Sequence, residues 1–130
     1  MNAQLQTIVA RYQVLPDYNF PAGCNPMRKD GFDSAEALLV YTGLKSRWAD
    51  KIEPGWYGFD LTLWPPVNWY HAVNAFLTWL ETQQPEFKIR QIKLKFGRLH
   101  IYVTYPVENE ELRKDIFEFS QRFTDKKLVY

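Results

Sequence analysis

Residues Gln91 to Tyr105, QIKLKFGRLHIYVTY, decide the fold because they predict a β-hairpin whose two faces differ in chemistry. A two-residue loop at Phe96 and Gly97 and a four-residue loop from Lys95 to Arg98 give the same register. That register predicts the cross-strand pairs Leu94–Leu99, Ile92–Ile101, Lys93–His100 and Gln91–Tyr102. Because side chains alternate along a strand, one face is apolar, with Ile92, Leu94, Leu99, Ile101 and Val103. The other face carries Gln91, Lys93, His100, Tyr102 and Thr104.

The turn of this hairpin combines one suitable residue with one unusual residue. Gly97 supplies the positive φ that a tight hairpin needs. Phe96 is not a preferred turn residue, so we expect it to have a packing or binding role.

The N-terminal part is predicted to hold two helices joined by an irregular segment. Helical spacing of Leu5, Ile8, Val9 and Tyr12 predicts an amphipathic helix over residues 3–14. Prolines, glycines and asparagines crowd residues 16–31, which predicts irregular structure. A second helix should begin near Ser34 and bend or end at Gly43. Its expected inner face consists of Ala35, Leu38, Leu39 and Thr42.

Alternation and helical spacing predict the elements of the C-terminal part. Residues 58–64, GFDLTLW, alternate as in a half-buried strand. A helix capped by Asn68 should run to about Gln84 with a wide apolar stripe of Trp69, Ala72, Val73, Phe76 and Leu80. After the hairpin, a last helix should bury Leu112, Ile116, Phe119 and Phe123. Residues 126–130 form either a short strand or a tail.

The predicted fold class is α+β in a single domain of residues 1–130, with a helical part at 1–53 and a core at 54–130. From residue 58 the order is β-α-β-β-α, followed by a last β if residues 126–130 form a strand. That order predicts an antiparallel sheet with helices on one face, either ferredoxin-like or a three-stranded variant. The other face of the sheet is left for solvent or a partner.

The composition favours a folded, cytoplasmic protein without a cofactor. The aromatic content of 17% is far above that of disordered chains. The single Cys24 excludes an internal disulfide and any multi-thiolate metal site. No signal-peptide pattern or membrane-length apolar run occurs, so we expect no membrane contact.

Charges are sorted into blocks although the net charge is only +1. The charged residues between Ile52 and Phe87 are all acidic, whereas those between Lys88 and Tyr105 are all basic. Such sorting either steers a charged partner or lets neighbouring elements satisfy each other's charges. The tryptophans also cluster, between Trp48 and Trp79, and we expect Trp69 and Trp79 to be core residues.

Catalytic patterns are absent from the sequence, so we predict that the chain is not an enzyme. His71 falls on a predicted helix and His100 on a predicted strand, with no acid or thiol at a diagnostic spacing. No P-loop, GxGxxG, HExxH or GxSxG motif occurs. We therefore assign no catalytic residue and no metal ligand.

The hairpin also resembles a known sequence signature. It is similar to the K-x-K-F-G-x-L-R-F-Y signature of small uncharacterised bacterial and phage proteins. The matching residues are Lys95, Phe96, Gly97, Leu99 and Tyr102, and an acidic region with Gly55-Trp56 precedes them. The resemblance covers roughly the C-terminal half and implies a phage or mobile-element context. Many of those proteins continue into a Cys-x-x-Cys tail, and no such motif follows here, so metal binding is not carried over.

Two functions are predicted for the basic, aromatic face of the hairpin. The first is a non-catalytic protein-binding module, in its most specific form an inhibitor of a bacterial defence or host protein, whose partner could be acidic. This module uses either the hairpin or the surface around Trp56 and Tyr57. The alternative is a single-stranded nucleic-acid-binding protein in which basic residues contact phosphates and aromatic rings, Trp64 among them, stack on bases. The expected binding residues are Lys93, Lys95, Arg98, His100 and Tyr102.

Overall fold

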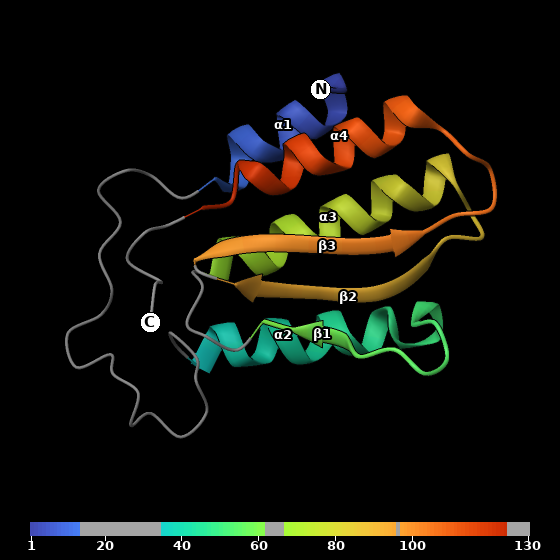
Figure 1. Cartoon of the computed structure of the whole chain (residues 1–130). Helices are drawn as coiled ribbons and strands as arrows, with labels where there is room; N and C mark the ends of the chain where they lie inside the picture. Colours follow the sequence, from blue (N-terminus) through green and yellow to red (C-terminus); the bar gives the residue numbers. More distant parts are fainter. Residues whose placement is uncertain (14–34, 62–66, 96, 125–130) are drawn as a thin grey trace.

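The computed structural model describes residues 1–13, 35–61, 67–95 and 97–124 (Figure 1). Some of the expectations above lie outside these residues: the irregular segment 16–31 with Cys24, the start of the second helix near Ser34, the end of the strand predicted at 58–64, the role of Phe96, and a strand at 126–130. The stacking role of Trp64 also lies outside them.

Four α-helices, one short 3₁₀ helix and three strands make a mixed α+β fold. In chain order they are α1 (Ala3–Tyr12), α2 (Ala35–Arg47), η1 (Ala49–Lys51), β1 (Gly58–Asp60), α3 (Val67–Gln83), β2 (Lys88–Lys95), β3 (Arg98–Thr104) and α4 (Glu110–Gln121). In Figure 1, α2 lies behind β1, α3 crosses behind β3, and α4 lies next to α1. Helix α4 also contacts β3. The predicted α+β class is confirmed.

Strands β2 and β3 form the predicted hairpin with the predicted register. The pairs Gln91–Tyr102, Ile92–Ile101, Lys93–His100 and Leu94–Leu99 are all present. Only two residues connect the strands, and Gly97 has the expected positive φ, 74°. A bulge at Arg90 was not predicted. Ile89 and Ile92 are three residues apart, so in a regular strand their side chains would point to opposite faces of the sheet. The bulge places Ile89, opposite Val103, on the core side, where it is fully buried.

The prediction of an antiparallel sheet is only partly correct, because β1 pairs with β2 in the parallel direction. The strand order is β1-β2-β3, with Gly58, Phe59 and Asp60 beside Gln91, Ile92 and Lys93. The 17-residue α3 returns the chain along the sheet, so β2 starts at the same end as β1. A ferredoxin-like order is also wrong for the described strands, since a split βαβ unit would place another strand between these two.

Helix α3 forms the centre of the core. Its predicted stripe is confirmed, since Trp69, Ala72, Val73, Phe76 and Leu80 are all buried. Trp69 and Trp79 are core residues as expected, at 2% and 7% exposure. The helix begins at Val67, so Asn68 lies in its first turn and not at the predicted cap. The inner face of α4 is also as predicted, and its Phe119 stacks on Phe76 with ring centroids 4.8 Å apart.

The prediction for the inner face of the second helix is wrong. Leu39 is 74% exposed and Leu38 is 39% exposed. Apolar residues occur on all sides of α2, so their spacing does not select a buried face. The contacts of Tyr41 select it. Its ring stacks on Tyr70 with centroids 5.1 Å apart, and its hydroxyl accepts a hydrogen bond from the Leu61 amide at 3.1 Å. The buried residues of α2 are therefore Ala37, Tyr41 and Leu44.

Candidate functional site

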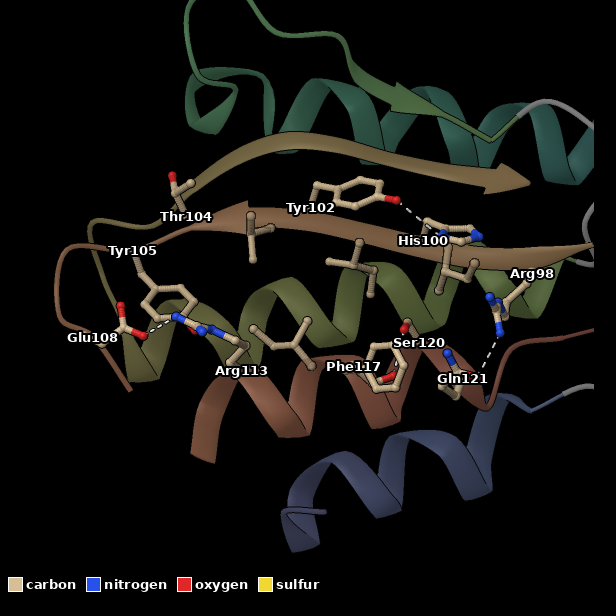
Figure 2. Close-up of a pocket in the computed structure, with 14 residues that line it drawn as sticks. Arg98, His100, Tyr102, Thr104, Tyr105, Glu108, Arg113, Phe117, Ser120 and Gln121 are labelled. Carbon is tan, nitrogen blue, oxygen red and sulfur yellow. Dashed lines mark hydrogen bonds and ion pairs between the residues drawn. The ribbon is translucent and has the colours of Figure 1, made fainter. Parts of the chain in front are cut away.

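Three of the five predicted binding residues gather on the face of the hairpin opposite the core. His100 and Tyr102 are two residues apart on β3, so both side chains point to this face, and Lys93 lies opposite His100 on β2. The two rings stack with centroids 6.2 Å apart and an interplanar angle of 17°. The Lys93 ammonium lies 5.7 Å from the centroid of the Tyr102 ring. Figure 2 shows the Tyr102 hydroxyl directed at the His100 ring, 3.5 Å from Nδ1.

The other two predicted residues extend this set toward the turn of the hairpin. Lys95 and Arg98 are the last pair before the turn. Lys95 is exposed, and Arg98 donates a hydrogen bond from Nη1 to Oε1 of Gln121 at 3.0 Å, which directs it toward α4. The five residues therefore form a continuous strip, here called the hairpin face: Lys93, Lys95, Arg98, His100 and Tyr102.

The surroundings of His100 favour its neutral form. Partial burial lowers the pKa of His100 below its ordinary value of 6.5, and the cationic side chains of Arg98 and Lys93 lower it further. A hydrogen bond to the Lys95 backbone acts in the opposite direction. The imidazole is therefore uncharged at neutral pH, and it adds an aromatic surface and not a cation to the hairpin face.

This lowered pKa predicts a pH-dependent contribution to stability. The unfolded chain binds a proton at His100 more readily than the folded chain, so the contribution is complete above about pH 6.5 and is lost as the pH falls through the lower, folded pKa. We expect the free energy of unfolding of His100→Gln to fall less between about pH 7.5 and about pH 5 than that of the wild type. Urea denaturation at each pH measures both. Parallel pH dependences of the two proteins would contradict the assignment.

A groove of about 490 Å³ lies between β3 and α4 and was not predicted. Figure 2 shows its residues, with Arg98 and Gln121 bonded near the end at the hairpin turn and Glu108 paired with Arg113 at the other end. The strand supplies Arg98 to Thr104, followed by Tyr105, and the helix supplies Arg113, Ile116, Phe117, Ser120 and Gln121. Sequence periodicity gives the faces of each element, but it does not give the gap between a strand edge and a helix.

The surface around Trp56 and Tyr57 is a second exposed aromatic site. Trp56 is 45% exposed and Tyr57 is 78% exposed. The guanidinium of Arg90, the bulge residue, lies 4.7 Å from the centroid of the Trp56 ring and donates from Nε to Glu53 Oε2 at 2.6 Å. One part of the charge sorting is thus satisfied within the fold, because an acid from the first block pairs with a base from the second.

The remaining chemistry of the described residues is sparse. His71 stacks on Tyr12 with centroids 5.9 Å apart. Within residues 1–13, 35–61, 67–95 and 97–124, no three His, Cys, Asp or Glu side chains come together as a metal site would require. No helix in the same residues has the length and apolarity to cross a membrane. Comparison of this chain with protein-family models, curated proteins and solved structures gave no significant match.

Proposed function

We propose that the chain is a non-catalytic protein-binding module that uses the hairpin face to hold an acidic segment of its partner. The observation that carries this proposal is the exposed Tyr102, 47% accessible, which has a cation and a second ring held against it. Aromatic and cationic side chains are the groups that dominate the free energy of protein interfaces.

The arrangement of this face supports binding in two ways. First, Tyr102 is in contact with both His100 and Lys93, so ordering these side chains on binding costs less conformational entropy than it would for isolated residues. Second, the strip from Lys93 to Arg98 contributes three cations and no acid. An acidic partner would therefore be both steered and oriented by this face.

The proposal also includes a biological setting. The signature around Lys95-Phe96-Gly97 suggests a phage or mobile-element protein that acts in the cytoplasm. In this setting the partner is a bacterial defence protein or another host protein, and binding inhibits it.

The test compares two exposed tyrosines. Immobilised wild-type chain is expected to capture a bacterial protein from a lysate, and the affinity of the purified partner should fall at least about 30-fold for Tyr102→Ala, the loss typical of an aromatic hot spot. Tyr57→Ala, which removes a ring that is 78% exposed outside the hairpin face, is the matched control and should bind as the wild type does. Capture of nothing above background, or equal binding by wild type and Tyr102→Ala, would contradict the proposal. Loss for Tyr57→Ala alone would assign the interface to the Trp56 surface.

Single-stranded nucleic acid is the second candidate, favoured by the stacked His100 and Tyr102 rings beside Lys93. Fluorescence anisotropy with labelled oligo-dT and oligo-rU at low and high salt distinguishes the two functions. Binding that falls steeply with salt, and that Lys93→Ala and Tyr102→Ala both abolish, would replace the protein-binding proposal. No binding at low salt would remove this candidate.

A further inference from the structure

Strand β3 is an edge of the described sheet, and from Leu99 onward its own sequence lacks the charges and prolines that normally protect an edge strand. The order β1-β2-β3 leaves one side of β3 without a neighbouring strand. From Leu99 to Tyr105 the sequence LHIYVTY contains no Asp, Glu, Lys, Arg or Pro. Natural proteins usually place charges or prolines in such edges because an open, apolar, β-prone edge pairs with other chains. This edge is therefore suited to pairing.

The backbone groups of β3 show which peptide units are available. The Leu99 amide points away from β2 and donates to the Phe123 carbonyl at 3.0 Å. Because peptide groups alternate along an antiparallel strand, the amides of Ile101 and Val103 point to the same open side. Within the described part of the chain, neither amide has a hydrogen-bond partner on that side. Among the described residues, the chain at Phe123 and Thr124 closes the start of the edge.

The helix beside this edge also offers an apolar contact. Phe117 is 62% exposed and lies midway along the α4 wall of the groove, between Arg113 and Gln121 (Figure 2). Val107, just beyond the strand, is 63% exposed. Phe117 therefore offers an exposed apolar side chain in the groove beside β3.

The two ends of β3 differ in their charged side chains, although the end beside α4 also has Lys88 opposite Thr104 and Arg113 beside Glu108. The hairpin end has Lys95 and Arg98, and the other end has Glu108, Glu110 and Glu111 before and in the first turn of α4. Glu108 is paired with Arg113, but Glu110 and Glu111 are exposed and form no ion pair with any described residue. If a second copy of β3 runs antiparallel to the first, the basic end of each strand lies beside the acidic end of the other.

We propose that a second copy of this chain docks here, with β3 of one copy antiparallel to β3 of the other around a two-fold axis at Val103. In this register Val103 lies opposite Val103 of the other copy, and Ile101 lies opposite Tyr105, the first residue after β3. Arg98 and Glu108 are equally far in sequence from Val103, so the basic end of each copy lies toward the acidic end of the other. The two α4 helices lie on the same side of the joined sheet, where their Phe117 side chains add apolar contact to the short strand pairing.

This dimer does not depend on the proposed function, because strand pairing extends the sheet in its own plane. Lys95 and Arg98 belong both to the hairpin face and to the basic end of the dimer contact, but neither Phe117→Glu nor Tyr102→Ala changes them. The ring faces of Tyr102 and His100 remain on the open face. Loss of dimerisation and loss of partner binding are thus separate results.

The first experiment measures the mass of the full-length chain by analytical ultracentrifugation over a range of concentrations. The wild type is expected to change from monomer to dimer as its concentration rises. Phe117→Glu should raise the dimer dissociation constant at least about tenfold, because it places a charge in an apolar contact. Leu39→Glu is the matched control: Leu39 is 74% exposed on α2, away from the groove, and its variant should dimerise as the wild type does.

The second experiment follows amide hydrogen exchange residue by residue at low and high concentration. The Ile101 and Val103 amides should become more protected at high concentration, whereas those of His100 and Tyr102, already directed at β2, should change little. A chain that stays monomeric throughout overturns the proposal and leaves the edge to a strand of another protein. A dimer in which exchange at Ile101 and Val103 does not depend on concentration also overturns it, as does equal weakening by Phe117→Glu and Leu39→Glu.

Discussion

Replacing Phe119 by alanine is expected to lower the free energy of unfolding by about 3–5 kcal/mol, the range for truncating a buried aromatic side chain. Phe119 is fully buried and holds α4 to α3 through its stack on Phe76 at 4.8 Å. It also packs against Phe123, with centroids 5.0 Å apart. The substitution therefore leaves a cavity beside the Phe76 and Phe123 rings, and urea denaturation followed by circular dichroism measures its cost.

Phe117→Ala on the same helix is the matched control for this loss. Its ring is 62% exposed, so the same chemical change should alter the free energy of unfolding by only about 0.5 kcal/mol. Both variants must be measured at low protein concentration, because dimerisation would otherwise add to the apparent stability of chains that retain Phe117. Similar losses for the two variants would show that α4 does not pack through the face that contains Phe119.

The sequence predicted those elements of the fold whose residues are spaced by one clear period. The hairpin pairs from Gln91–Tyr102 to Leu94–Leu99 follow from strict alternation, because a slip by one residue would place lysine in the core. The inner faces of α3 and α4 follow in the same way from helical spacing.

The errors arose where local pattern does not determine the answer. In α2 the apolar residues surround the helix, and contacts of Tyr41 with Tyr70 and Leu61, distant in sequence, choose the buried side. Whether β1 pairs parallel or antiparallel to β2 depends on how α3 crosses the sheet. The sequence of a three-residue strand does not indicate the direction of the strand beside it. The bulge at Arg90 is likewise a tertiary feature that keeps Ile89 in the core.

The candidate site was predictable only as a set of residues on one face. Register placed Lys93, His100 and Tyr102 together, and the structure brings their side chains into contact. The bond between Arg98 and Gln121 and the groove beside it depend on the distance between β3 and α4, which no sequence period encodes.

Replacing Trp48 by alanine should lower the free energy of unfolding by about 3–5 kcal/mol. Trp48 follows α2 and is 2% exposed. Its indole N–H donates to Asn74 Oδ1 of α3 at 3.0 Å, and its ring packs against Phe87 with centroids 6.0 Å apart. The variant thus loses an apolar contact and leaves a partly buried amide oxygen without its donor, and thermal and urea denaturation both report the loss.

Trp56→Ala is the matched control, because the two tryptophans belong to the same cluster in the sequence. Trp56 is 45% exposed, and its main described contact is the Arg90 guanidinium 4.7 Å from its centroid. An exposed cation–π contact contributes about 0.5–1 kcal/mol, so Trp56→Ala should cost no more than about 1 kcal/mol. A loss for Trp56→Ala as large as that for Trp48→Ala would contradict this division, because it would make Trp56 part of the core. The expected difference instead means that the tryptophan cluster is mainly structural and that Trp56 is the member available to a partner.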